Sequence, residues 1–257
     1  MLSFFGIHVL GRPRAVSSGS VIDVFGRAGI TEEAVRSTLT RMVNRELLER
    51  HRRGRKMYFG LTARAVGVLR DGHDRVWRAG AVNRDWNGRW TLVGFSLPEA
   101  WRSERHDLRS RLIWGGFGPL QNGLWVAPSE ADVPGLLAGL GLDAQLRVFR
   151  GELIAPSDAG QVLAQAFDMP GIAAGYRAFL DRWEDGRTPV EDPLARQLLV
   201  HTDWLDLVRR DPHLPAEHLP ADWPAVRAEE VFRSHARRCE KPAARLAEQV
   251  VDAIELD

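Results

Sequence analysis

Two groups of polar and basic side chains lie close together between residues 31 and 56, and their types suit contacts with nucleic acid. The first group recurs at the spacing of one helix face and consists of Glu33, Arg36, Ser37, Thr40, Arg41 and Asn44. In the major groove of DNA, Arg can bind guanine edges or phosphates, and Ser, Thr and Asn can bind bases or the backbone. Taken alone, the pattern is equally typical of a solvated helix face.

The second group is entirely cationic and follows within a few residues. An apolar run begins at Leu47 and another at Met57, and the basic residues between them are Arg50, Arg52, Arg53, Arg55 and Lys56. This order predicts a short strand, a turn and a second strand. Like charges at a hairpin tip repel one another unless an anion binds there, so the second group favours a phosphate backbone as the partner.

The elements that would position both groups follow from the neighbouring residues. Thr31 stands at the N-cap of the helix, and Glu32 and Glu33 place negative charge near the positive end of its dipole. The predicted buried stripe consists of Val35, Leu39 and Met42. A helix followed by a basic hairpin is typical of a winged helix-turn-helix. The predicted DNA-binding residues are Thr31, Arg36, Ser37, Thr40, Arg41, Asn44, Arg50, Arg52, Arg53, Arg55 and Lys56.

The residues before this helix complete a domain that we place at 1–80. A first helix is expected over 2–11, because Gly and Pro follow it directly. A short strand at 15–16 is expected to pair with the hairpin. A second helix, capped by Ser17 or Ser18, then leads through a glycine-containing turn into the polar helix.

Charge is divided unevenly along the 257 residues of the chain. The formal net charge is +1, but residues 1–80 hold 15 Arg or Lys and 7 Asp or Glu, which gives +8, and the remainder carries −7. This division fits a basic DNA-binding domain joined to an acidic regulatory body. Cys239 is the only cysteine, so an internal disulfide is excluded. No apolar run approaches the length of a membrane span, and we expect a cytoplasmic protein without membrane contact.

A second domain is expected at 81–155. Strands are predicted over 89–97, 123–127 and 145–149, with a short strand or turn at 115–119, and helices lie between them. The resulting order β-α-β-β-α-β is that of a ferredoxin-like domain.

Residues 156–257 are predicted to form an all-helical domain, for which the family resemblance given below implies effector binding and dimerisation. One helix is expected from Pro193 to about Arg210, and the last helix is expected from Ala225 to Ile254. The fold class is therefore α+β, with an N-terminal winged helix-turn-helix, a central ferredoxin-like domain and a helical C-terminal domain.

Three segments of the chain resemble, in order, the three domains of the PaaX-type transcriptional regulators, the repressors of phenylacetate degradation and their relatives. The segments are GITEEAVRSTLTRMVNRELLERHRRGRKMYFGLT, RWTLVGFSLPEAWRSERHDLRSRLIWGGFGPLQNGLWVAP and QLLVHTDWLDLVRRDPHLPAEHLPADWPAVRAEEVFRSH. The first alone would have little specificity, because many unrelated regulators contain a winged helix. Together the three segments extend over nearly the whole chain.

The resemblance implies a bacterial, homodimeric regulator, usually a repressor, that binds a double-stranded operator and is nucleoid-associated when bound. It also implies release by a small effector, which is phenylacetyl-coenzyme A in the namesake members. We therefore expect phenylacetyl-coenzyme A or another acyl-coenzyme A as the effector, and no cofactor. Aromatic and basic side chains could hold its acyl chain and phosphates, and the candidates are Arg177, His201, Trp204, Arg209, Trp223 and His235.

Two functions of other classes stay open as alternatives, a metal-dependent nuclease and a protein-interaction scaffold. The family's central domain is similar to a CRISPR-associated nuclease subunit, in which the first strand ends in a metal-binding Asp. Here Ser96 stands at that place, and a hydroxyl cannot replace a carboxylate on a divalent cation without a large loss of affinity. The His and Asp residues at 201–218 lack metal-site spacing, and no catalytic triad is evident, so neither a metal site nor an enzyme is expected.

Overall fold

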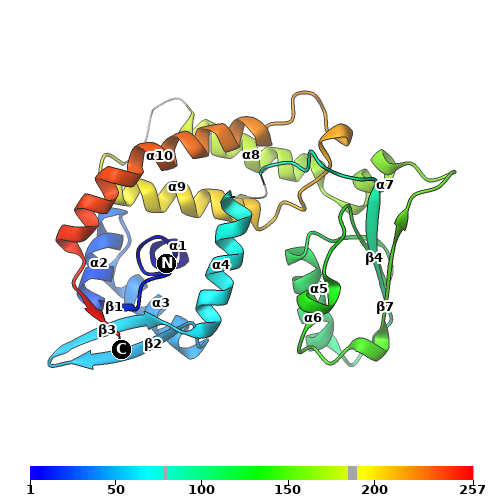
Figure 1. Cartoon of the computed structure of the whole chain (residues 1–257). Helices are drawn as coiled ribbons and strands as arrows, with labels where there is room; N and C mark the ends of the chain where they lie inside the picture. Colours follow the sequence, from blue (N-terminus) through cyan, green and yellow to red (C-terminus); the bar gives the residue numbers. More distant parts are fainter. Residues whose placement is uncertain (78–79, 185–189, 257) are drawn as a thin grey trace. The chain divides into compact units, whose positions relative to one another are not determined.

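The computed structural model describes residues 1–77, 80–184 and 190–256, and the predicted α+β class is confirmed. Within these residues the strands form two four-stranded sheets. The chain divides into two compact units (Figure 1): unit 1 comprises Met1–Arg78, Phe179–Leu205 and Arg227–Asp257, and unit 2 comprises Ala79–Ala178 and Asp206–Val226. In the described part of the chain, no helix is both long enough and apolar enough to cross a bilayer.

The N-terminal part of unit 1 alternates short helices and strands. In chain order they are α1 (Leu2–His8), β1 (Arg14–Ser17), α2 (Ser18–Arg27), α3 (Glu32–Asn44), β2 (Leu48–Arg53), β3 (Lys56–Leu61) and α4 (Ala63–Trp77). As predicted, β1 pairs with β3, and the Ser17 hydroxyl caps α2 by accepting a hydrogen bond from the Ser20 N–H at 3.1 Å. Gly29 adopts a φ of +78° in the turn between α2 and α3, a conformation that costs glycine little.

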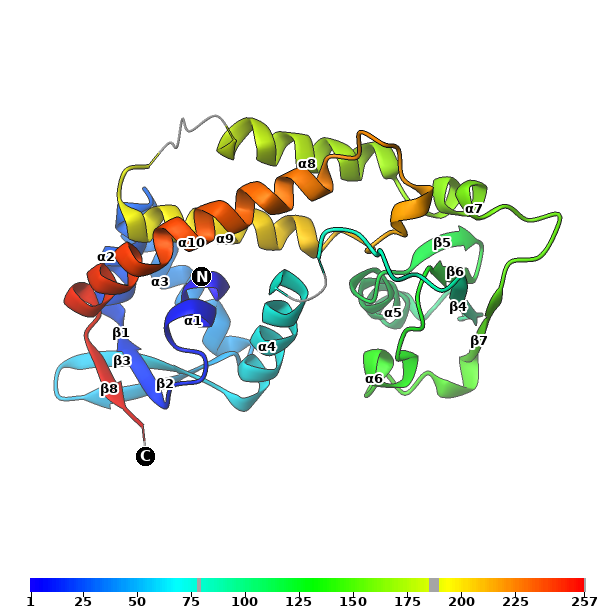
Figure 2. The same ribbon diagram turned by 45° about the horizontal axis from the view of Figure 1, so that its top comes forward.

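Later parts of the chain complete the core of unit 1. Helices α9 (Pro193–Val208) and α10 (Ala225–Val250) run side by side over the N-terminal elements (Figures 1 and 2). Their buried side chains Leu194, Leu198, Ala243 and Ala247 join one apolar cluster with residues of α1, α2, α3 and the hairpin. The hydrophobic core of unit 1 is therefore built from residues of both ends of the chain.

The last helix ends earlier than the sequence predicts. Helix α10 stops at Val250, and Ala253–Glu255 form strand β8, so the expectation of a helix to Ile254 and of an all-helical C-terminal part is wrong. Strand β8 pairs antiparallel with β1, with Ile254 opposite Ala15, and gives the sheet order β2-β3-β1-β8. The partner strand lies at the opposite end of the chain, so this long-range pairing overrides the local helical pattern.

Asp252, in the link between α10 and β8, connects three parts of unit 1. Its carboxylate pairs with the Lys56 ammonium at 2.8 Å and accepts a hydrogen bond from the Tyr58 hydroxyl at 3.2 Å. Its backbone N–H donates to the Ser20 hydroxyl at 2.8 Å, and its carbonyl accepts from the Ser17 N–H at 2.8 Å. The C-terminal segment is thereby joined both to the β2–β3 hairpin and to the start of α2.

Unit 2 is built around the second sheet. Its elements are β4 (Arg89–Phe95), α5 (Arg102–Trp114), β5 (Gly118–Gln121), β6 (Leu124–Ala127), α6 (Val133–Leu137), the 3₁₀ turn η1 (Asp143–Gln145), β7 (Leu146–Glu152), α7 (Ala159–Ala166), the first part of α8 (Met169–Trp183) and the 3₁₀ turn η2 (Ala216–His218). The strands are antiparallel in the order β5-β6-β4-β7. From β4 to β7 the order of strands and α-helices is the β-α-β-β-α-β predicted from the sequence.

Apolar side chains alternate between the two faces of this sheet, as the pleat requires. Val93 and Trp125 belong to the cluster that α5 and α6 cover, whereas Trp90 and Val126 belong to a second cluster with Leu163 of α7. Strands β4 and β6 therefore carry buried apolar side chains on both faces within unit 2.

Buried His8 makes the stability of unit 1 depend on pH. The residue is 6% exposed, and burial, assisted by the nearby Arg14 and Arg12 charges, lowers its pKa from 6.5 to about 4. Between these values the unfolded chain binds more protons than the folded one, so the free energy of unfolding decreases as pH falls from 6.5 to 4. The total loss from this residue approaches roughly 3 kcal/mol.

We predict that His8→Leu flattens the pH dependence of the free energy of unfolding over that range, measured by urea titration. His73→Leu, at an exposed position of α4, is the matched control and should keep the wild-type slope. Equal slopes for wild type and His8→Leu would contradict the assignment.

We predict that Asp252→Ala loosens the β2–β3 hairpin, because Lys56 and Tyr58 lose their shared partner. Hydrogen exchange followed by mass spectrometry should show faster exchange in the hairpin and a lower melting temperature. Glu255→Ala, an exposed position on β8, serves as the control. If hairpin exchange were the same in Asp252→Ala as in this control, the proposed anchoring would be refuted.

Candidate nucleic-acid interface

Helix α3 has the cap and the buried stripe that the sequence predicts. The Thr31 hydroxyl accepts a hydrogen bond from the Ala34 N–H at 3.3 Å. Val35, Leu39 and Met42 are buried in the core cluster of unit 1. Because these three side chains fix the rotation of the helix about its axis, the opposite face must point into solvent.

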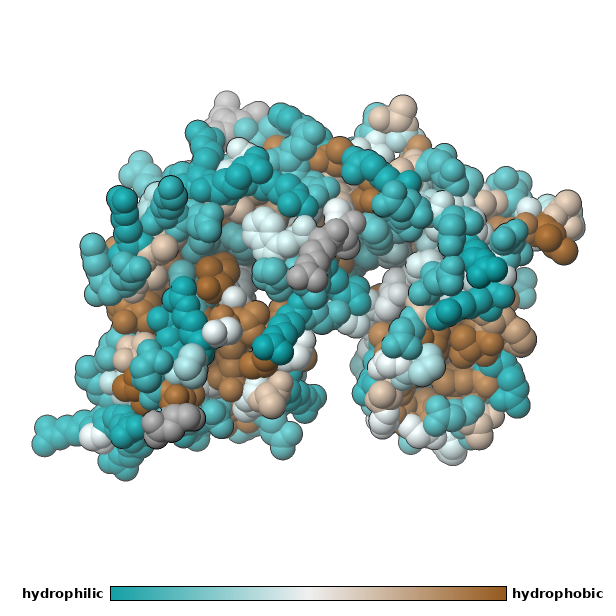
Figure 3. Space-filling view, viewed as in Figure 1, coloured by the Kyte–Doolittle hydropathy of each residue, from teal (hydrophilic) through white to brown (hydrophobic). Residues whose placement is uncertain are grey.

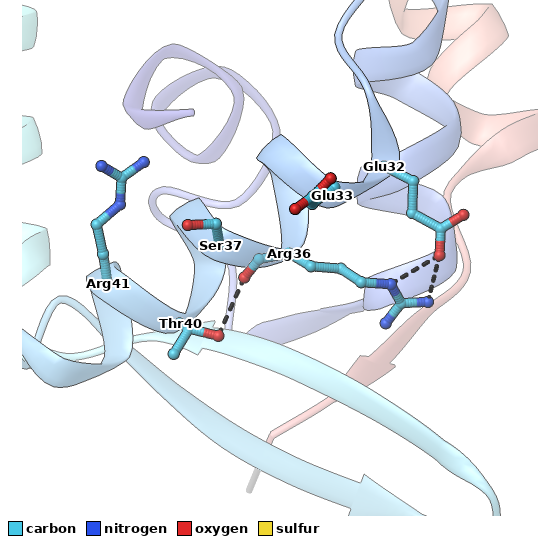
Figure 4. Close-up of a pocket in the computed structure, with 6 residues that line it drawn as sticks. All are labelled: Glu32, Glu33, Arg36, Ser37, Thr40 and Arg41. Carbon is cyan, nitrogen blue, oxygen red and sulfur yellow. Dashed lines mark hydrogen bonds and ion pairs between the residues drawn. The ribbon is translucent and has the colours of Figure 1, made fainter.

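The solvent face of α3 consists of Glu33 and of the helix residues that the sequence predicts for DNA contact. All six members of the helical set are exposed: Glu33, Arg36, Ser37, Thr40, Arg41 and Asn44. A shallow hollow on this face is lined by Glu32, Glu33, Arg36, Ser37, Thr40 and Arg41 (Figure 4). Figure 4 shows Arg36 and Arg41 extending in opposite directions, so that two guanidinium groups flank the hydroxyls between them.

The hydrogen bonds of these side chains determine what they can offer to a ligand. Arg36 pairs with Glu32 at 2.7 Å, with both side chains more than half exposed, and such a pair contributes little in water. The Thr40 hydroxyl donates to the Arg36 carbonyl at 3.0 Å, so it presents mainly its lone pairs to a ligand. Arg41 donates to the Thr38 hydroxyl at 3.0 Å. The two guanidinium groups are therefore the main hydrogen-bond donors on this face.

The basic residues after α3 form a hairpin as predicted. Arg53 pairs with Lys56 across the ladder, which leaves a two-residue turn of Gly54 and Arg55, with Gly54 at a φ of +59°. The five cations are exposed: Arg50, Arg52, Arg53, Arg55 and Lys56. The protruding end of the hairpin is hydrophilic in the space-filling view (Figure 3). Arg53 and Lys56 lie directly opposite each other on the ladder, where like charges repel. A bound anion would relieve that repulsion.

A second hollow links the hairpin to the helix that carries the polar face. Its walls come from the start of α2, from α3, from β3 with the hairpin turn, and from the end of α10 with the link after it. Its charged lining residues are Asp23, Arg36, Arg55, Lys56 and Asp252. Arg36 lines both hollows, so the α3 face and the hairpin form one continuous surface. The hydrogen bond from Lys56 lowers the pKa of Asp252, and Asp252 in turn raises the pKa of Lys56, so both stay charged at neutral pH.

The six predicted effector-binding residues divide between the two units. In unit 1, Trp204 is 1% exposed and its ring stacks on that of Phe232, with centroids 4.8 Å apart. The His201 ring meets Phe232 edge-on at 5.2 Å, and burial lowers the pKa of His201. His235 is buried with one ring nitrogen 2.8 Å from the Trp183 carbonyl. These three residues belong to an aromatic core.

The other three candidates lie in unit 2 at separate places. Arg177 is exposed on α8, and the Arg209 guanidinium lies over the Trp114 ring, 5.9 Å from its centroid. Trp223 packs against the cluster that contains Trp90 and Leu163. Their role in effector binding stays a prediction.

The position predicted to lack a metal-binding acid lies in unit 2. Ser96 is exposed and follows directly after β4. Across the described ranges, no group of three or more His, Cys, Asp or Glu side chains is placed to hold a metal ion. Asp203, which the sequence places near His201, instead accepts a hydrogen bond from the Trp183 indole at 2.8 Å.

Sequence reasoning missed the residues that support the interface from the C-terminal end. Asp252 lies in the segment predicted as a helix, although its carboxylate pairs with Lys56 and accepts a hydrogen bond from Tyr58. The alternation of apolar Ile254 and Leu256 with acidic Glu255 and Asp257 is a short period-two signal for a strand. Its brevity hides it beside a long helical pattern.

Comparison with known proteins places the chain in a family. A model described as a PaaX-like protein matches residues 1–65, the PaaX protein central Cas2-like domain matches residues 83–163, and the PaaX-like protein C-terminal domain matches residues 167–249. The transcriptional repressor PaaX of Escherichia coli strain K12 is 27% identical over 237 residues, which cover 86% of this chain and 73% of that protein.

A solved structure shares the fold. The uncharacterized protein Rv0674 from Mycobacterium tuberculosis superposes with a TM-score of 0.64 at 23% identity, and the match covers 95% of each chain. Three family models thus follow one another in order along nearly all of the sequence. The chain belongs to the PaaX family.

Proposed function

We propose that the protein is a transcriptional repressor that binds double-stranded DNA through α3 and the β2–β3 hairpin. The observation that carries this proposal is the continuous exposed surface on which Arg36 joins the polar face of α3 to the cations of the hairpin. The E. coli relative is named a transcriptional repressor, which supports the same function. The proposed activity is non-enzymatic and would take place in the cytoplasm, on nucleoid DNA.

We assign a winged helix-turn-helix to unit 1 and a ferredoxin-like fold to the sheet of unit 2. The first assignment is supported by the succession of α2, a glycine turn and α3, followed by a hairpin that pairs with β1. The second is supported by the antiparallel strand order β5-β6-β4-β7 around two helices.

In the proposed complex α3 enters the major groove. Arg36 and Arg41 approach base edges, with Ser37, Thr40 and Asn44 beside them and Thr31 at the helix start. The hairpin cations contact phosphates or the minor groove, where their repulsion is relieved. The contacts of α3 in the groove and those of the hairpin together would fix the orientation of α3 relative to the DNA axis.

The regulator is proposed to act as a homodimer on a near-palindromic operator. Two copies of α3 would then reach successive major grooves about 34 Å apart. An acyl-coenzyme A such as phenylacetyl-coenzyme A is the proposed effector, and its binding would favour a form with lower affinity for the operator.

Competition gel shifts with the DNA upstream of the protein's own gene test the proposal. Wild-type protein should prefer this DNA to unrelated DNA of equal length, whereas a scaffold that binds an acidic protein would show no preference. Arg36→Ala and Arg41→Ala should each reduce the preference by about 1–3 kcal/mol if the contact is bidentate. Glu33→Gln is the control on the same helix face. Unchanged preference in both Arg variants would remove α3 from the recognition model.

The hairpin should contribute affinity without sequence preference. Arg53→Ala and Arg55→Ala should weaken binding to all DNA alike and reduce the slope of log K against log salt by roughly 0.9 for each lost phosphate contact. Fluorescence anisotropy at several salt concentrations measures both effects. Arg109→Ala, at an exposed position of α5 in unit 2, is the control. A wild-type slope in the hairpin variants would rule out phosphate contacts there.

A further inference from the structure

A cavity of about 450 Å³ lies within unit 2, and none of the residues assigned to DNA contact lines it. Its walls come from three stretches: the end of α5 with β5, the α7–α8 junction with the first turns of α8, and the end of α9 with the segment that follows it. The volume lies in the range of small-molecule sites. Three segments that are distant in sequence meet around one hollow.

Most of the cavity wall is apolar. The large side chains are Ile113, Phe117, Pro119, Phe167, Ile172, Leu207 and Pro212. Ile113 is 53% exposed, so part of this apolar wall is open to solvent. Binding of an apolar molecule would be favourable, because it would remove apolar surface of this wall from water.

Two glycines allow the segments around the cavity to approach one another closely, and they leave the space inside it unfilled. Gly175 lines the cavity from α8, and a Cβ there would lie 3.1 Å from the Leu207 side chain. A Cβ at Gly118 would lie 2.3 Å from the Ala166 carbonyl, so β5 approaches the end of α7 backbone to backbone. A side chain larger than hydrogen at Gly175 would occupy the space beside Leu207.

The polar groups of the cavity differ in what they can offer to a ligand. Tyr176 donates a hydrogen bond to Asp211, which also accepts one from the His213 N–H at 2.7 Å. Asp168 caps α8 by accepting from the Gly171 N–H at 3.0 Å. Arg210 is exposed at the same cavity and has no ion-pair partner among the described residues. The carboxylates are engaged within the protein, so the guanidinium is the group suited to an external anion.

We propose that this cavity binds the apolar body of a small organic anion, with the anionic group paired to Arg210. Binding of a ligand in this cavity does not depend on the proposed function. Only the identification of that ligand with the effector rests on it. The anion can be a carboxylate beside an aromatic or aliphatic body, or a phosphate of an acyl-coenzyme A whose acyl chain fills the cavity. Both share one chemistry, an apolar group next to a negative charge.

Calorimetric titration of the full chain distinguishes a carboxylate from a coenzyme A phosphate as the source of the anionic group. The probes are 3-phenylpropanoate and octanoate, their uncharged primary amides, and octanoyl-coenzyme A. We expect saturable binding of at least one anionic probe with weaker binding of the amides. Tighter binding of the thioester than of octanoate assigns the anion to coenzyme A phosphates, and the reverse order assigns it to a carboxylate.

Two variants locate the ligand. Arg210→Gln should reduce the affinity for the anionic probe about tenfold or more while leaving that of its amide unchanged. Arg109→Gln removes the same charge from α5, outside the cavity, and should bind like wild type. Gly175→Leu should abolish binding of charged and uncharged probes alike by filling the cavity, with circular dichroism to verify folding.

Several outcomes would overturn the proposal. They are no binding of any probe by the wild type, equal losses in Arg210→Gln and Arg109→Gln, or full binding by folded Gly175→Leu. A gel shift with upstream DNA tests the link to the effector separately. The anionic probe should release the wild-type protein from this DNA but should not release Gly175→Leu. A wild-type protein that binds the probe but no DNA would refute the proposed function and leave the cavity proposal intact.

Discussion

The pairing of β8 with β1 is the interaction on which the rest of unit 1 depends. It brings the last residues of the chain to the sheet that carries the basic hairpin, and it places Asp252 within reach of Lys56 and Tyr58. The same residue also holds the start of α2 through Ser17 and Ser20. Helices α9 and α10 fill the core beneath, so the proposed DNA-binding surface is supported by residues from the C-terminal third of the chain.

This arrangement explains how a strongly cationic hairpin can be part of a stable fold. The charge excess of residues 1–80 is concentrated where the backbone is already fixed by sheet pairing and by a buried helix face. In the part of the chain that the structure describes, Lys56 is the one hairpin cation with a carboxylate partner from the distal end of the chain, while Arg52, Arg53 and Arg55 are exposed at the tip. Repulsion among them is tolerated because the stabilising contacts lie elsewhere, and that repulsion becomes useful when phosphates approach.

Local signals were sufficient to predict the elements of the interface. The Thr31 cap, the stripe of Val35, Leu39 and Met42, and the turn at Gly54 depend on near neighbours in sequence, and the structure contains all of them. The three-residue strand β8 leaves only a brief local signal, because its stability comes from a partner at the other end of the chain. The effector-binding residues stay a prediction, and composition alone does not distinguish a core ring such as Trp204 from one that lines a cavity.

Site-specific photo-cross-linking tests the central claim most directly, namely that α3 lies against DNA. A benzophenone amino acid at Ser37, on the exposed face of α3, would be compared with the same group at Phe149, which is 62% exposed on β7 of unit 2. With labelled DNA from upstream of the gene, the account predicts cross-links from position 37 and none from position 149. Cross-links from position 149 alone, in proteins that both bind the DNA, would contradict it.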